Sequence, residues 1–266
     1  MRLVLLASGS TGNCALISEG DTHLLIDAGI SARRICGGLQ QQGLELRDIA
    51  GVLVTHEHTD HIAGLRVLLR RAPLPVYTIA PAARALRALL PEHADALCEI
   101  EPDCAALVGG AAVTPFCTQH DAAGSCGYRI SGESGSVGFC TDLGAVTETV
   151  RCALRGVDGA VIEANHDIDM LRNGPYPAYL KRRILSDYGH LSNDAAGDLA
   201  AELAYHGTRS LILGHLSRHN NTPQRALETV SRALCAALPP EALPELCAAP
   251  EAGPLAVEIG ARVCCL

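Results

Sequence analysis

The chain has 266 residues, enough for one large or two small domains, and 48% of them are hydrophobic, so it can bury a sizeable core. The formal net charge of −8 argues against a broadly basic surface, and the lack of Trp, with two Phe and six Tyr, argues against aromatic platforms for single strands. We find no apolar run long enough for a membrane span, and the N-terminal apolar stretch is too short for a signal peptide. The twelve cysteines contain no C-x-x-C pair, so we expect reduced thiols in a cytoplasmic protein rather than a zinc ribbon.

The first half of the chain is predicted to alternate strands with helices. Short apolar runs bounded by Gly, Ser or Asn predict strands at 2–6, 14–18, 23–29, 51–55 and 74–79. Helical spacing of apolar residues predicts helices at 32–42, 60–71 and 81–90. Ser31 is placed to cap the first of them.

The second half repeats this pattern. Strands are predicted at 111–116, 127–130, 136–140, 159–164 and 210–215, and helices at 191–207 and 222–238. The proline-rich stretch 239–254 is predicted to be a loop or short linker, followed by a closing strand at 255–263 on a sheet edge. Because no clean boundary separates the two similar halves, we expect residues 1–266 to form one α/β domain, with two packed sheets and helices outside.

The heptapeptide THEHTDH, residues 55–61, has the composition of a metal site. His56 and His58 are two apart on an extended segment, so their side chains leave one face, whereas Asp60 and His61 follow where the chain turns into a helix. Such a loop can serve two neighbouring ions more easily than one tetrahedral ion. Imidazoles mixed with carboxylates accept Zn²⁺, Mn²⁺ and Fe alike, so we expect two divalent ions of one of these kinds.

The pattern T-H-x-H-x-D-H after a strand resembles the signature of the metallo-β-lactamase superfamily of hydrolases, and this resemblance implies an αββα four-layer sandwich. It also implies that later strand ends supply the remaining ligands. By similarity, one ion would be held by His56, His58 and His120, and the other by Asp60, His61 and His215. Asp142 would bridge the two ions, and Asp27 would support the ligand loop from behind.

Longer motifs resemble the YycJ (WalJ) group of this superfamily. They are LASGSTGN (6–13), EANHD (163–167), GPYPAYLKRRILSDYGHLSN (174–193) and LGHLSRHNN (213–221). The resemblance implies a cytoplasmic exonuclease that acts on duplex DNA in the 5′-to-3′ direction. Two cations that share Asp142 would lower the pKa of a bridging water, so that a metal-bridging hydroxide is the expected nucleophile.

A proton donor for the leaving alkoxide is expected among the remaining histidines. His190 matches the position of a proton-donating histidine in related tRNA nucleases, and Glu163 matches the acid that orients it. His190 could instead only cap or pack at a helix start. His166 is the alternative donor or a phosphate contact, and Asp60 is also placed among the catalytic candidates.

Substrate contacts are expected from cationic and amide side chains. The candidates are Lys181, Arg182 and Arg183 in YLKRRI, together with Asn165, Arg218 and Asn220. The basic run could equally be a solvated helix face, and GSTGN (9–13) could be a phosphate nest or a simple turn. DNA is therefore the expected partner and no membrane contact is expected, whereas the oligomeric state is not predicted. The alternative functions are a small-molecule hydrolase for a cyclic phosphodiester, lactone or thioester, and, less favoured, a regulatory protein with a structural metal centre.

Overall fold

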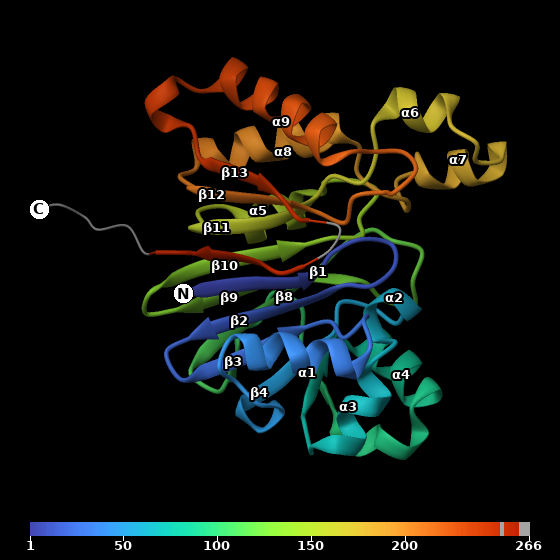
Figure 1. Cartoon of the computed structure of the whole chain (residues 1–266), viewed down its shortest axis with the longest axis vertical. Helices are drawn as coiled ribbons and strands as arrows, with labels where there is room; N and C mark the ends of the chain where they lie inside the picture. Colours follow the sequence, from blue (N-terminus) through green and yellow to red (C-terminus); the bar gives the residue numbers. More distant parts are fainter. Residues whose placement is uncertain (251–252, 261–266) are drawn as a thin grey trace, which may run out of the picture.

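The structure, a computed structural model, describes residues 1–250 and 253–260 and contains two seven-stranded sheets (Figure 1). The first sheet has the order β14-β1-β2-β3-β4-β5-β6. Its strands are β1 (Arg2–Ala7), β2 (Cys14–Glu19), β3 (Thr22–Ile26), β4 (Ile49–Leu53), β5 (Val76–Thr78), β6 (Leu97–Glu99) and β14 (Leu255–Glu258).

The second sheet has the order β13-β12-β11-β10-β9-β8-β7. Its strands are β7 (Ala106–Val108), β8 (Ala111–Cys117), β9 (Cys126–Gly132), β10 (Gly135–Cys140), β11 (Gly159–Glu163), β12 (Ser210–Gly214) and β13 (Glu245–Ala248). In both sheets an antiparallel part continues into a parallel part, β3 to β6 in the first and β10 to β13 in the second.

Helices lie outside the two sheets, most of them on the outer faces. In the first half they are α1 (Ala32–Gln41), α2 (Thr59–Ile62), α3 (Leu65–Arg71) and α4 (Ala80–Leu89), with 3₁₀ turns η1 (Leu46–Asp48) and η2 (Pro91–Ala96). In the second half they are α5 (Glu148–Leu154), α6 (Ile168–Asn173), α7 (Ala178–Ile184), α8 (Asn193–Tyr205) and α9 (Pro223–Ala237), with η3 (Pro240–Ala242). None of the described helices is long and apolar enough to cross a bilayer.

Three apolar clusters hold these layers together, and the largest lies between the sheets. There, side chains such as Leu5 and Ile26 of the first sheet meet Tyr128 and Val161 of the second. The other two clusters join one sheet to α1, α3 and α4, and the other sheet to α5, α8 and α9. The predicted four-layer α/β sandwich is therefore confirmed, and Figure 1 shows α8 and α9 over one sheet and α1 and α3 under the other.

One prediction was wrong at the helix expected over 60–71. The structure divides it into α2 and α3, with a break at Gly64. The Gly64 amide donates to the Ala28 carbonyl at 2.8 Å, and a Cβ at Gly64 would lie 2.1 Å from the Ile30 carbonyl oxygen. This close approach to the segment after β3 requires glycine and stops the helix from continuing straight.

A second prediction was wrong at 239–254, which was expected to be only a loop or linker. Within it, Glu245–Ala248 forms β13, which pairs in parallel with β12. This edge strand was missed in the sequence because it has only four residues and is flanked by proline-rich segments that predict a loop. The closing strand is confirmed as β14 on a sheet edge, although residues 261–263 of the predicted strand lie outside the described residues.

Candidate metal centre

The site lies where the parallel strands of both sheets end. β3 leads to Asp27, β4 leads to the THEHTDH loop, and β10, β11 and β12 lead to Asp142, Glu163 and His215. The carboxyl ends of parallel strands meet at one edge, so residues far apart in sequence converge there. The ligand loop passes from β4 into the short helix α2, with His58 at its N-cap position.

Three of these strand-end residues have an unusual backbone. Asp27, Asp142 and His215 have φ values of 59°, 58° and 55°, in the left-handed region that non-glycine residues rarely adopt. Such a conformation costs on the order of 1–3 kcal/mol and persists where the surroundings enforce it. All three side chains contact the histidine cluster: Asp27 and Asp142 lie 2.7 and 3.2 Å from His61, and His215 lies 3.1 Å from Asp142.

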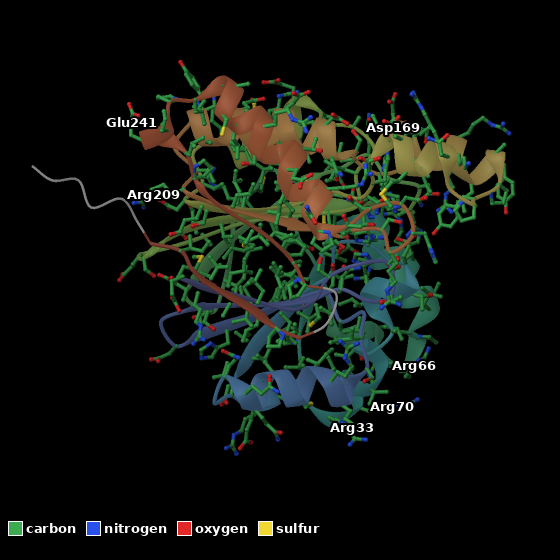
Figure 2. The ribbon with its side chains drawn as sticks, turned by 45° about the horizontal axis from the view of Figure 1, so that its top comes forward. Arg33, Arg66, Arg70, Asp169, Arg209 and Glu241 are labelled. Carbon is green, nitrogen blue, oxygen red and sulfur yellow. The ribbon has the colours of Figure 1, made fainter. Side chains whose placement is uncertain are left out.

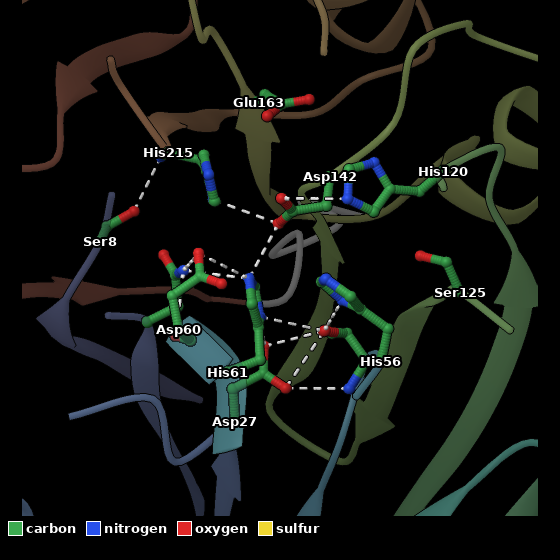
Figure 3. Close-up of polar contacts among 12 residues, drawn as sticks. Ser8, Asp27, His56, Asp60, His61, His120, Ser125, Asp142, Glu163 and His215 are labelled. Carbon is green, nitrogen blue, oxygen red and sulfur yellow. Dashed lines mark hydrogen bonds and ion pairs between the residues drawn. The ribbon is translucent and has the colours of Figure 1, made fainter. Parts of the chain in front are cut away.

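The structure brings all seven predicted ligands together. In each of four groups, one nitrogen or oxygen atom per residue lies within 4.8 Å of the others. The groups are His56 with His58 and His120; Asp60 with His61 and His215; His56 with His61 and Asp142; and Asp142 with Glu163, His190 and His215. Asp142 shares a group with histidines from both halves of the chain, and Figure 3 shows contacts from His61, His120 and His215 meeting at its carboxylate.

Asp27 fixes the orientation of two histidines that are predicted ligands. Its Oδ2 accepts from His61 Nδ1 at 2.7 Å, and its Oδ1 accepts from the Thr55 backbone amide at 2.8 Å. The Thr55 hydroxyl donates to Asp27 and lies 3.0 Å from His56 Nδ1, which places a proton on that nitrogen. His56 Nε2 and His61 Nε2 are thereby left to face the cluster, as metal ligation requires.

His120 is held in the same manner from the other half of the chain. Its Nδ1 donates to the Gly189 carbonyl at 3.1 Å, so its Nε2 faces the cluster. This bond also ties His120 to the residue that precedes His190. The contact therefore links the predicted ligand to the segment that carries the predicted proton donor, whose ring is held by Glu163.

The donor set fits divalent cations. His56 Nε2, Asp142 Oδ2 and His215 Nδ1 are buried and make no hydrogen bond within the described residues. Burial acts to raise the pKa of Asp142, but His215 and His61 outweigh it and hold that pKa well below its usual range. Burial lowers the pKa of His61, whereas Asp142 and Asp27 raise it well above its usual range. An ionised carboxylate among inward-facing imidazoles is an arrangement that cations stabilise.

The partly exposed His190 pairs with the buried Glu163 beside Asp142. Glu163 Oε1 lies 2.7 Å from His190 Nδ1, and its Oε2 accepts the backbone amides of Leu143 and Leu191 at 3.1 Å each. Burial favours the neutral imidazole, but the Glu163 carboxylate outweighs it and raises the pKa of His190 to about 9. His190 Nδ1 also lies 3.8 Å from Asp142 Oδ1, so the ring stands beside the cluster, and Nε2 is the ring nitrogen that Glu163 does not engage.

His166 differs from His190 in its surroundings. It is 1% exposed, and neither ring nitrogen makes a hydrogen bond within the described residues. Burial lowers the pKa of His166 to about 4, so the ring is neutral at physiological pH. It belongs to none of the four ligand groups. The geometry accordingly favours His190 over His166 as a proton donor.

The loop between β1 and β2, which contacts the histidine cluster, was not predicted to do so from the sequence. The Ser8 hydroxyl accepts from the His215 backbone amide at 2.8 Å, while Asn13 Nδ2 lies 3.1 Å from His61 Nε2. The Asn13 amide also donates to the Asp60 carbonyl at 2.8 Å. The LASGSTGN motif was noticed in the sequence, but nothing in it indicated that it packs against the ligand loop. Within GSTGN the Gly12 amide donates to the Gly9 carbonyl at 3.0 Å, which closes a turn, while phosphate binding by this segment stays a prediction.

The predicted substrate contacts lie in different surroundings. Arg182 and Arg183 are exposed on α7; Arg183 binds Asp121 at 2.5 Å, and Lys181 donates to the Arg172 carbonyl at 2.7 Å. Arg218 is exposed beyond β12. The amides are buried: Asn165 Nδ2 donates to the His215 carbonyl at 2.9 Å, and Asn220 is 0% exposed. Substrate binding by these six side chains stays a prediction.

Comparison with known proteins identifies relatives of this chain. Residues 22–216 match the model of the Beta-lactamase superfamily domain. The chain is 37% identical over 231 residues to exodeoxyribonuclease YycJ of Bacillus anthracis, a match that covers 86% of this chain and 88% of the relative. It is 33% identical over 241 residues to exodeoxyribonuclease WalJ of Streptococcus pneumoniae, with 88% of each protein covered.

Solved structures share the fold at low sequence identity. The metallo-β-lactamase fold protein YhfI of Bacillus subtilis has a TM-score of 0.72 at 19% identity, covering 96% of this chain and 99% of that one. Zn²⁺-bound PqqB of Methylobacterium extorquens has a TM-score of 0.71 at 17% identity, covering 97% and 100%. With the matching domain model and two relatives along most of its length, the chain belongs to the metallo-β-lactamase superfamily and is a metal-dependent hydrolase.

Proposed function

We propose that this protein is a two-metal-dependent phosphodiesterase that degrades double-stranded DNA from the 5′ end. The observation that carries the proposal is the His190–Glu163 pair, which lies beside the ligand cluster and next to the basic helix α7. A hydrolase with a protonated imidazole at this position can release an alkoxide leaving group. The relatives named exodeoxyribonuclease support DNA as the substrate.

Two divalent ions would be held by the seven ligands in the sets expected from the sequence, with Asp142 shared between them. When bound, the ions would supply an activated water and neutralise negative charge on the phosphate as the reaction proceeds. The chain's own residues do the remaining work. Asp27 and Gly189 fix which imidazole nitrogens face the cluster, and Glu163 holds His190 against the strand end that also carries Asp142.

His190 would protonate the leaving oxygen. Its Nδ1 is engaged by Glu163, so its Nε2–H is the donor that points away from the pair. The same carboxylate keeps the ring protonated at neutral pH, and a positioned general acid of this kind contributes roughly 10²–10⁴-fold to a rate. His190 transfers this proton to the 3′ oxygen and recovers one from solvent.

The surface around α7 supports a nucleic-acid substrate. Residues 172–188 contain four cationic side chains and one carboxylate, a net charge of +3 within a chain whose net charge is −8. Tyr179 and Tyr188 are 67% and 58% exposed in the same segment. Cations that bind phosphates beside aromatic rings are typical of nucleic-acid surfaces.

The test compares substrates for the metal-loaded protein. Wild type and Asp142→Ala are incubated with Mn²⁺ or Zn²⁺ and 5′-labelled duplex DNA, 3′-labelled duplex DNA, single-stranded DNA or bis-p-nitrophenyl phosphate. We expect wild type to shorten the duplex from its 5′ end and Asp142→Ala to be inactive on every substrate.

A different outcome would identify the alternative. If wild type cleaves small phosphodiesters, lactones or thioesters but degrades no polynucleotide with either metal, the protein is a small-molecule hydrolase and the nuclease proposal is wrong. Shortening from the 3′ end would retain the nuclease and reverse the polarity.

A further inference from the structure

A small hollow beside the ligand cluster has not been assigned a role. Its volume is about 170 Å³, and its lining includes Ser10, Asn165, Tyr176, Arg183, His190 and His215. Two of these side chains, His190 and His215, belong to the site, and their rings are 5.3 Å apart. The opposite wall comes from the segment around α7, which also contributes Leu180 and Ile184. The hollow is therefore continuous with the reaction centre.

Its position relative to His190 determines which part of a substrate would occupy it. A general acid must lie within hydrogen-bond reach of the oxygen that it protonates. The fragment attached to that oxygen consequently leaves on the side of His190, which is the side of the hollow. In 5′-to-3′ degradation with a 3′-oxygen leaving group, that fragment is the 5′-terminal part of the cut strand.

The size of the hollow limits the length of that fragment. About 170 Å³ is less than the roughly 300–1,000 Å³ of clefts that enclose a whole drug-sized ligand, so the hollow can enclose one nucleotide only in part and has no room for a second. Figure 1 shows α6 and α7 standing out beyond α8 and α9. A second, larger hollow of about 650 Å³ lies elsewhere. Arg209 and Glu241 belong to its lining, and Figure 2 places both at the end of the molecule away from Asp169 of α6.

The lining offers partners for each part of a nucleotide. Tyr176 packs edge-on against His219, with ring centroids 5.7 Å apart, and such a partly exposed ring can stack on a base. Arg183, which is paired with Asp121, lines the hollow together with the hydroxyl-bearing Ser10 and Ser217, and Asp121 itself is part of the lining. Guanidinium and hydroxyl groups are the donors that bind a terminal phosphate.

We propose that this hollow binds the 5′-terminal nucleotide of the DNA strand and that the α7 wall makes cleavage exonucleolytic, releasing one nucleotide per cut. The inference rests on the proposed nuclease function. A water oxygen forms a bond to the phosphorus between the first two nucleotides while the bond from phosphorus to the first nucleotide's 3′ oxygen breaks. That oxygen keeps the electron pair and takes a proton from His190, and the water's proton passes to solvent. The products are a nucleoside 5′-monophosphate and a strand with a new 5′-phosphate.

The test uses one variant that narrows the hollow and one that removes a lining ring, and it measures the length of the DNA products. Leu180→Trp adds bulk to its wall and Tyr176→Ala removes the candidate stacking ring. The matched controls are Leu107→Trp and Tyr205→Ala, at side chains 76% and 75% exposed outside the lining. Metal-loaded proteins are given 5′-phosphorylated duplex DNA, with deoxyadenosine 5′-monophosphate as a competing product.

We expect wild type and both controls to release mononucleotides. Leu180→Trp should lower nucleotide release at least tenfold, and by more than it lowers hydrolysis of bis-p-nitrophenyl phosphate. Tyr176→Ala should raise KM for DNA about tenfold, in line with the loss of one stacked base, and both variants should weaken inhibition by the monophosphate.

Two results would overturn the role of the hollow and leave the proposed nuclease function in place. One is wild-type products several nucleotides long, and the other is unchanged mononucleotide release by Leu180→Trp and Tyr176→Ala. If wild type degrades no DNA at all, the nuclease function itself is wrong and the inference fails with it. Thermal unfolding of each variant, compared with its control, identifies any loss of activity that comes from misfolding.

Discussion

Two buried carboxylates, Asp27 and Glu163, hold the histidines of this site in position. Asp27 orients His61 directly and His56 through the Thr55 hydroxyl, although it lies behind both rings and faces no substrate. Glu163 acts similarly on the other side, because it holds His190 and also accepts the amide that follows Asp142. Each carboxylate therefore fixes a proton on one imidazole nitrogen and leaves the other nitrogen for chemistry.

Replacing Asp27 tests this orienting role. Asp27→Asn should lower metal affinity about 10–100-fold, because supporting hydrogen bonds to ligand histidines have effects of that size. The measurement is a metal titration by calorimetry, with Asp21→Asn in the exposed turn after β2 as the matched control. Equal affinity for the Asp27 variant and wild type would contradict the role.

The His190–Glu163 pair predicts a pH dependence. Glu163 raises the pKa of His190 to about 9 against the effect of burial, so the proton is present below that pH and is lost as pH rises through it. The rate should therefore fall above about pH 9. In Glu163→Gln the carboxylate charge is gone and the descending limb should move to lower pH.

The check is a pH–rate profile on DNA for wild type, Glu163→Gln, His190→Ala and the remote control His206→Ala. His190→Ala should be slowed roughly 10²–10⁴-fold, whereas His206→Ala should match wild type. A Glu163→Gln profile that superimposes on that of wild type would show that another group is the acid.

At the scale of elements, the close approach of α3 to the segment after β3 positions the ligand loop. Gly64→Ala would place a Cβ 2.1 Å from the Ile30 carbonyl oxygen, so the backbone must shift. We expect it to lower the free energy of unfolding by more than about 2 kcal/mol, toward the upper part of the usual range for single substitutions. Gly37→Ala in α1, where a Cβ meets nothing within 4 Å, should instead stabilise by about 0.5–1 kcal/mol. Urea unfolding of both variants measures the difference; equal stabilities would refute the steric argument.

The sequence predicted elements well where local periodicity decides them. The helix predicted after Ser31 begins where that cap indicates, since the Ser31 side chain accepts the Arg34 amide of the first turn. The predicted helices α8 and α9 begin directly after Ser192 and Thr222, whose side chains accept amides in the same way. The sequence-based prediction of helix bounds failed where contacts between distant residues set them. At Gly64 the contact is with the Ile30 carbonyl, more than thirty residues earlier in the chain. The seven ligands could be proposed from order and resemblance, but Ser8 and Asn13 could not, because their partners are set only by the packing of sheets.

At the scale of the whole molecule, the ligand cluster joins the two halves of the sandwich. Four predicted ligands come from the loop after β4 of the first sheet, and the predicted ligands His120, Asp142 and His215 come from the second half of the chain. The apolar core between the sheets holds them at this distance. A cation bound across the cluster would consequently hold the two sheets together at the edge where their parallel strands end.

Metal binding should therefore stabilise the folded protein, in addition to its proposed part in catalysis. A ligand that binds only the native state adds about 2.7 kcal/mol when its concentration is 100 times its Kd. For a chain of this size each kcal/mol shifts Tm by about 2–4 °C, so Mn²⁺ or Zn²⁺ should raise the Tm of chelator-treated protein by roughly 5–11 °C. Asp142→Ala, which loses the carboxylate shared between the ligand groups, should show a much smaller shift. Scanning calorimetry with and without metal makes the comparison. A wild-type Tm that does not change with metal would mean that the cluster binds no ion tightly, because its ligands span both sheets and any tight binding there must favour the folded state.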